Sequence, residues 1–184
     1  GSFSSIGYYE SRDVRAAVRF VHDFIPADQR RPVILLGVSM GAAAVLKAAA
    51  EQPAGIDGLI VDSPYASLPE IVDQAAHHFS GIPRGVLWRM VSCIEYVVGP
   101  LLQMNPAQYV KRLAIPVLFI HAITDSVTHA GHSVRLFRRM YKKNAAPSWL
   151  WLTPPAKHAF CYLSYPKHYE VRVAKFLEAV RQRI

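Results

Sequence analysis

The chain has 184 residues, enough to bury one hydrophobic core, and its 52% apolar and 18% charged residues exclude a disordered protein. Its formal net charge is +8, but the basic residues are scattered and form no zinc-finger, RNP or basic-region pattern, so we expect no nucleic-acid partner. The densest basic group, within residues 135–143, is typical of a solvated helix face. We expect a single domain over residues 1–184.

The first predicted elements follow from the spacing of apolar residues. From Glu10 to Phe24 they recur at three- and four-residue steps, which predicts an amphipathic helix. A continuous apolar run at 33–38 predicts a strand buried on both faces, and an alanine-rich helix is predicted at 41–52. The remaining predicted elements are strands at 58–64, 116–122 and 148–153 and helices near 67–79, 132–143 and 167–183. Strands alternating with helices favour an α/β fold, a parallel sheet flanked by helices.

Residues 77–105 contain more chain than a simple crossover needs. The segment GIPRGVLWRMVSCIEYVVGPLLQM is strongly apolar, but Arg89, Glu95 and Pro100 interrupt it. A membrane span would need about 20 largely uncharged residues. We therefore predict a lid-like helical insertion at 77–105, with an ordinary helix packed on the sheet as the alternative, and membrane association stays open.

A serine between two glycines joins the strand at 33–38 to the following helix. Gly37-Val38-Ser39-Met40-Gly41 fits the pattern G-x-S-x-G, which alone is a weak signal. Its place between a buried strand and a helix is where a sharp turn exposes a nucleophilic serine. We expect a strained backbone at Ser39, with glycine at 37 and 41 because side chains there would collide.

A serine hydroxyl is a poor nucleophile and needs a base that is itself oriented by an acid. Asp125 follows the third predicted strand in FIHAITDS, and His158 follows the fourth in PPAKHAF. The carboxyl ends of parallel strands meet at one edge of a sheet, so both side chains are expected beside Ser39.

The blocks GYYESRDVRAAVRFV, GVSMGAAA, VDSPYASL, IPVLFIHAITD and KHAF resemble the successive blocks of serine esterases and peptidase-like enzymes of the α/β-hydrolase superfamily, in the C-terminal part of their fold. The resemblance implies Ser39 as nucleophile, His158 as general base and acid, Asp125 as its orienting acid, and the Met40 N–H as one oxyanion donor. Two positions depart from the pattern, because Ala122 and Lys157 stand where the family usually has glycine.

The resemblance also implies what this chain lacks. The family's N-terminal strands have no equivalent here, and the loop that normally provides the second oxyanion donor lies among them. The chain is therefore expected to be N-terminally truncated relative to the family. The strand at 33–38 would then have a free apolar edge, through which homo-oligomers could form.

Other acidic, histidine and cysteine residues are alternatives to these candidates. Asp62, after the second strand, is the rival to Asp125 as the acid. His121, His129 and His132 lie near Asp125 in sequence, but no H-E-x-x-H motif accompanies them, and Cys93 and Cys161 form no C-x-x-C pair. We therefore expect no metal and no cofactor. The two separated cysteines are typical of a reducing compartment and leave localisation open.

Two functions remain. The first is a serine hydrolase that cleaves carboxylic ester, thioester or amide bonds of a small-molecule acyl substrate through an acyl-enzyme. The alternative is a catalytically silent hydrolase-fold module that binds a ligand or a partner. The three candidate catalytic residues favour the enzyme, and the missing N-terminal strands favour silence for the chain in isolation.

Overall fold

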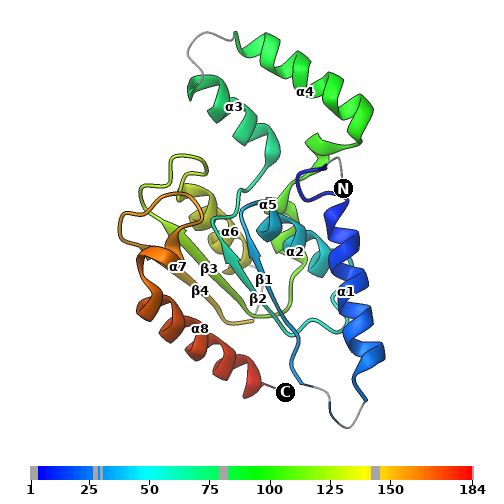
Figure 1. Cartoon of the computed structure of the whole chain (residues 1–184), viewed down its shortest axis with the longest axis vertical. Coiled ribbons are helices and arrows are strands. Elements are labelled where there is room, and N and C mark those ends of the chain that lie inside the picture. Colours follow the sequence, from blue (N-terminus) through cyan, green and yellow to red (C-terminus); the bar gives the residue numbers. More distant parts are fainter. Residues whose placement is uncertain (1–3, 27–28, 30, 79–82, 142–145, 184) are drawn as a thin grey trace.

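The computed structural model describes residues 4–26, 29, 31–78, 83–141 and 146–183 (Figure 1). Its sheet has four parallel strands in the order β1-β2-β3-β4, which is also their order along the chain. The strands are β1 (Ile34–Val38), β2 (Gly58–Asp62), β3 (Val117–Ala122) and β4 (Ser148–Thr153). The predicted parallel sheet is confirmed, and each strand lies within or at the range expected from its apolar run.

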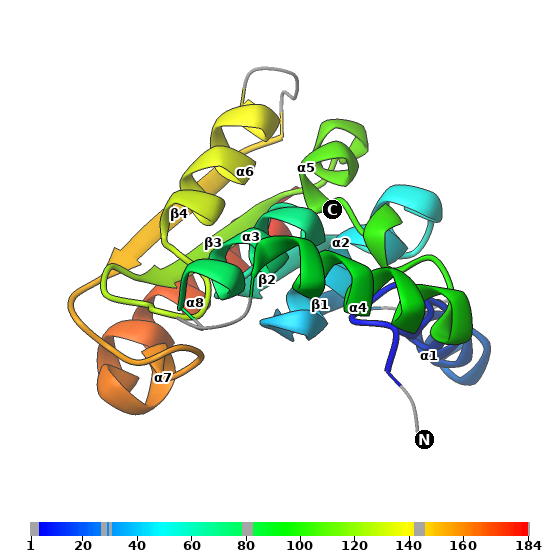
Figure 2. The same cartoon turned by 90° about the horizontal axis from the view of Figure 1, so that it is seen from above.

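Helices cover both faces of the sheet (Figures 1 and 2). The longer ones are α1 (Glu10–Phe24), α2 (Met40–Glu51), α3 (Leu68–His78), α4 (Arg84–Val98), α6 (Gly131–Tyr141) and α8 (Pro166–Arg181). The short ones are η2 (Leu101–Gln103), α5 (Pro106–Tyr109), η3 (Val110–Arg112) and α7 (Cys161–Ser164). Helix α1 has the predicted bounds, and the last two residues of the helix predicted at 132–143 lie outside the described residues.

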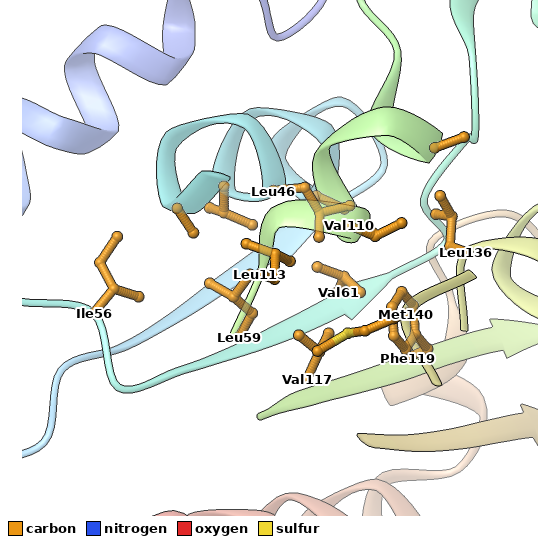
Figure 3. Close-up of a cluster of buried hydrophobic side chains, with 14 of the residues drawn as sticks. Leu46, Ile56, Leu59, Val61, Val110, Leu113, Val117, Phe119, Leu136 and Met140 are labelled. Carbon is orange, nitrogen blue, oxygen red and sulfur yellow. The ribbon is translucent and has the colours of Figure 1, made fainter. Parts of the chain in front are cut away.

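The larger core lies between the sheet and the layer formed by α1, α2 and α6. Alternate residues of the central strands point to this side, as Val61 and Phe119 do toward Leu46 of α2 and Met140 of α6 (Figure 3). The two central strands are buried along their whole length. Near-continuous burial of this kind is why these strands read as apolar runs without alternation.

The opposite face of the sheet packs against α8. Ile60 and Leu118 point to this side and contact a cluster that includes Phe176 and Val180 of the helix. Side chains of neighbouring residues on one strand point to opposite faces, so each central strand contributes to both cores. Packing in the two cores holds the four strands in place in the sheet. The loops that follow the carboxyl ends of these strands carry the candidate site.

Helices α3 and α4 lie beyond the carboxyl end of the sheet (Figures 1 and 2). Asp73 of α3 accepts hydrogen bonds from Arg84 (2.8 and 2.7 Å) and from the Trp88 indole (2.9 Å), which joins the two helices. The other face of α4 is open, and its exposed side chains line an apolar hollow of about 420 Å³: Val86, Arg89, Met90, Cys93 and Ile94. The predicted lid-like insertion at 77–105 includes α4, and residues 79–82 within it lie outside the described part.

Within the described residues, no single helix is long and apolar enough to cross a bilayer. The bent pair Arg84–Tyr96 and Leu101–Arg112 meets the criterion only when its two members are taken together across a 102° bend.

Strand β1 lies at one edge of the sheet. In the part of the chain that the structure describes it pairs with β2 alone, so its other side presents unpaired backbone groups. Its side chains are unusually open for an apolar strand: Leu36 is 54% exposed and Val38 is 37% exposed. Edge strands of soluble proteins are commonly guarded by charge, proline or a covering element. Strand β1 carries neither a charge nor a proline.

We propose that β1 pairs with another strand, and that the isolated chain does so with a second copy of itself. Light scattering should then give a dimer, with slow amide exchange along 34–38. Leu36→Lys should return the monomer by placing a charge on the edge, whereas Val171→Lys, at an equally exposed position of α8 (52%), should leave the dimer intact. A wild-type monomer over a wide concentration range, with fast exchange along β1, would contradict the proposal.

Candidate active site

Ser39 occupies the turn between β1 and α2 with a backbone conformation that few residues adopt. Its φ is 53° and its ψ is −116°. Its N–H donates to the Asp62 carbonyl oxygen (2.8 Å), and its own carbonyl accepts from the N–H groups of Ala42 and Ala43 (3.1 and 3.3 Å). Positive φ at a residue other than glycine is strained and is held only by surrounding contacts. The strain expected at this serine is present.

The two glycines that flank Ser39 differ in what they allow. A Cβ on Gly37 would lie 2.6 Å from the Gly41 carbonyl carbon and 2.7 Å from the Ala42 Cα, so backbone atoms exclude any side chain. A Cβ on Gly41 would meet nothing within 4 Å. The expected collision therefore holds for Gly37 and is wrong for Gly41, because Gly41 is already in the first turn of α2 and points away from β1.

His158 lies beside Ser39 although the two are 119 positions apart in the sequence. It comes from the segment between β4 and α7, and its Nε2 is 2.8 Å from Ser39 Oγ. Its other ring nitrogen, Nδ1, is 2.7 Å from Asp125 Oδ2. A carboxylate only accepts hydrogen bonds, so Nδ1 carries the hydrogen and Nε2 is free to accept from the serine hydroxyl. The structure thus brings the three predicted residues together in one chain of contacts.

Asp125 is held by the backbone of its own loop. Its Oδ1 accepts from the N–H groups of Val127 and Thr128, both at 2.9 Å. Its side chain has no exposed surface. Burial alone would raise the pKa of this carboxyl, but hydrogen bonds from His121, His158 and the Thr128 N–H outweigh it and hold the pKa well below its usual range. Asp125 is therefore ionised at neutral pH while it faces the His158 ring.

Asp62, the rival acid, contacts other groups. Its Oδ1 accepts from the Ser63 hydroxyl (2.9 Å), and burial is the main reason that its pKa is raised, against hydrogen bonds from Ser63, Cys161 and Tyr169. Among the described residues, no hydrogen bond joins its carboxyl to His158. Asp62 reaches the candidate site through its main chain, which accepts the Ser39 N–H.

Three positions with strained backbone gather around these contacts. Ser39 follows β1, Ser63 follows β2 with φ of 52°, and Ala159 follows His158 with φ of 61°. The Ala159 N–H also approaches the Ser63 hydroxyl (3.4 Å). Strained residues cluster at functional sites more often than elsewhere. Their concentration here points to the same edge of the sheet as the three predicted side chains.

The histidines near Asp125 have separate surroundings. His132 is buried and contacts the Ala66 N–H and the Gln74 side chain, and burial lowers its pKa to about 4. His129 is exposed. In the described ranges, no three side chains of His, Cys, Asp or Glu gather as a metal-binding group.

Two residues contact the candidate site in a way that the sequence does not predict, since it indicates His121 only as part of a possible metal cluster and does not indicate Thr128. His121 lies 3.2 Å from Asp125 Oδ2, and the Thr128 hydroxyl lies 3.2 Å from both that oxygen and His158 Nδ1. A signal for His121 was present, since it is the polar residue at the carboxyl end of an otherwise apolar strand. No comparable signal marks Thr128, whose contact depends on how the loop after β3 folds back.

Comparison with known proteins extends these observations. Residues 10–97 match the model of a family described as serine aminopeptidase, S33. Among solved structures, an esterase of Pyrococcus furiosus, Pf2001, superposes with a TM-score of 0.74 and 21% identity over 97% of this chain and 65% of its own. The chain has the α/β-hydrolase fold, in part.

Two other similar proteins are longer than this chain. The Pyrococcus horikoshii acylaminoacyl peptidase superposes with a TM-score of 0.67 and 17% identity over 94% of this chain and 27% of its own. The uncharacterized protein YqkD of Bacillus subtilis (strain 168) is 27% identical over 97% of this chain. The chain spans 57% of the length of YqkD. These similarities show the fold that the chain shares with these structures.

The rim of the candidate site near Ser39 and His158 is apolar. Met40 directly follows Ser39, Ile123 and Val127 flank Asp125, and Phe160 and Tyr162 follow His158. These five side chains are between 38% and 55% exposed: Met40 38%, Ile123 53%, Val127 55%, Phe160 46% and Tyr162 47%. Exposed apolar side chains gathered around polar groups are typical of ligand-binding surfaces.

Proposed function

We propose that this chain carries the reacting residues of a serine hydrolase that cleaves carboxylic ester, thioester or amide bonds. The observation that supports it is the continuous contact from Ser39 Oγ through His158 to Asp125, with distances of 2.8 and 2.7 Å. Nucleophile, base and orienting acid at hydrogen-bonding distance are the groups that acyl transfer requires. The relation to esterases and peptidases supports the same chemistry.

In the proposed acylation, Ser39 Oγ attacks the carbonyl carbon of the substrate while His158 Nε2 takes the hydroxyl proton. The positive charge that forms on the imidazole is stabilised by the ionised Asp125. Collapse of the tetrahedral intermediate breaks the bond to the leaving group, which receives the proton from Nε2. An ester of Ser39 remains, and a water activated by His158 hydrolyses it by the same steps.

The negative oxygen of the intermediate needs hydrogen-bond donors. Met40 is the first residue of α2, and the first N–H groups of a helix have no acceptor within it. Its N–H and the positive end of the helix dipole would therefore stabilise the oxyanion. A second donor would have to come from outside this chain, because the resemblance assigns it to the absent N-terminal part.

We also propose that α4 covers the site and that the acyl group is hydrophobic. Helix α4 lies beyond the carboxyl end of the strands (Figure 1). Ser39 and His158 belong to the segments that follow the carboxyl ends of β1 and β4. The exposed apolar side chains of α4 and the apolar rim around Ser39 support a hydrophobic acyl group. Each buried methylene of such a chain is worth about 0.8 kcal/mol, so affinity should grow with chain length.

A series of alkyl fluorophosphonates tests both proposals in the full-length gene product. The probe should label Ser39, and labelling should be lost in Ser39→Ala and kept in Ser92→Ala, a serine on the exposed side of α4. The second-order labelling rate should rise about three- to fourfold per added methylene. Labelling that survives Ser39→Ala would refute the nucleophile, a flat series would refute the apolar acyl site, and an unlabelled wild type would favour the silent binding module.

A further inference from the structure

His121 lies beneath the candidate site as a fully buried polar side chain. It belongs to β3, whose other side chains are all apolar, and its exposed fraction is 0%. A polar ring is buried at a cost unless its nitrogens find partners. The partners that His121 finds connect it to Asp125.

Both ring nitrogens of His121 have defined contacts. Nε2 is 2.7 Å from the Thr128 carbonyl oxygen and 3.2 Å from Asp125 Oδ2. These two oxygens only accept, so Nε2 must carry a hydrogen that is shared between them. Nδ1 is 2.7 Å from the Ser133 hydroxyl of α6, which fixes the rotation of the ring.

Asp125 Oδ2 is therefore approached from two sides. His158 Nδ1 reaches it at 2.7 Å from the site, and His121 Nε2 reaches it at 3.2 Å from the core. The opposite oxygen is held by the backbone of residues 127 and 128. Oδ2 is the atom that faces His158, and on the protein side it is held by His121 Nε2 and by the Thr128 hydroxyl, which donates to it at 3.2 Å.

We propose that His121 is a positioning residue that holds the Asp125 carboxylate, and through it His158, in the geometry for accepting the Ser39 proton. The proposal rests on the proposed serine hydrolase function. His121 also ties the Thr128 carbonyl, and the Thr128 hydroxyl lies 3.2 Å from His158 Nδ1. One buried ring thus fixes both the acid and the loop that surrounds it.

The role is tested with four single substitutions. His121→Met keeps the volume and removes the donor, His121→Gln keeps an N–H donor within reach, and Ser133→Ala frees the rotation of the ring. The matched control is His132→Met, which removes another buried histidine whose contacts are to Ala66, Gln74 and Arg135 and not to Asp125. Steady-state hydrolysis of an ester substrate, measured over a range of pH, gives kcat and KM for each variant.

His121→Met should lower kcat about 10- to 100-fold with little change in KM, the effect of one hydrogen bond to a charged group. In both His121→Gln and Ser133→Ala, kcat should fall less than it does in His121→Met. A carboxylate with one donor fewer attracts the proton on His158 more strongly, so the acid limb of the kcat/KM profile should move to higher pH in His121→Met. His132→Met should lower stability without moving kcat or this limb.

A second readout does not depend on turnover. The proton between His158 Nδ1 and Asp125 should give a far-downfield proton NMR resonance in the wild-type chain, absent in Asp125→Asn and shifted in His121→Met. If the wild type fails to hydrolyse esters, the hydrolase proposal fails while this resonance still tests the positioning. The positioning role is overturned if the wild type is active and His121→Met has the same kcat, the same acid limb of the kcat/KM profile and the same downfield proton resonance. Should His121→Met not fold, His121→Gln and Ser133→Ala decide by the same readouts.

Discussion

Asp125→Asn is expected to lower kcat about 10,000-fold in the active full-length protein and to leave KM nearly unchanged. The backbone N–H groups of Val127 and Thr128 hold Oδ1, so the amide oxygen of asparagine must take that place. Its NH₂ group then replaces Oδ2 and faces His158 Nδ1. Two donors cannot face each other, and the His158 ring must therefore carry its hydrogen on Nε2. In that tautomer it cannot accept the Ser39 proton.

Asp62→Asn is the matched control for this prediction. It makes the same chemical change at a buried carboxyl that follows the neighbouring strand, and it leaves the carbonyl that accepts the Ser39 N–H in place. The asparagine oxygen can still accept from Ser63. We expect kcat within about tenfold of the wild type. If only the Asp62 change lowered kcat by several orders of magnitude, the assignment of the orienting acid would be wrong.

Contacts that follow from the order of the strands could be predicted from the sequence, whereas contacts that depend on the path of a loop could not. The sequence predicts that Ser39, Asp125 and His158 meet, because each lies in the segment that follows a strand of one parallel sheet, and the ends of such strands share an edge. The apolar runs also located the strands. Strands β2 and β3 are buried at every residue, so their sequences are continuously apolar and show no alternation of apolar and polar residues. These predictions needed only the order of elements and the direction of the strands.

Contacts across the loop after β3 could not be predicted in the same way. His121 reaches Asp125 because residues 123–128 turn back over the end of the strand, and Thr128 joins them through the same turn. Apolar periodicity carries no information about such a turn. The different demands at Gly37 and Gly41 are likewise set by how closely α2 approaches β1, a distance that the G-x-S-x-G pattern does not contain.

These two glycines give the second large prediction. Gly37→Ala should destabilise the chain by about 3 kcal/mol or more, since its Cβ would meet backbone atoms of Gly41 and Ala42 that cannot move aside. For a chain of this size that is a fall in melting temperature of roughly 6 to 12 °C. Gly41→Ala should instead stabilise by about 0.5 to 1 kcal/mol, because its Cβ would enter open space in a helical turn, where alanine is favoured over glycine.

Thermal and urea unfolding of both variants measure the difference directly. The opposite signs matter, because the same chemical change is made twice within five residues, and a general intolerance of this turn would lower both stabilities. Equal losses in the two variants would mean that the turn tolerates no methyl group on either side of Ser39. Opposite signs would mean that β1 and α2 approach each other most closely at Gly37, and that this contact holds Ser39 in its strained conformation toward His158.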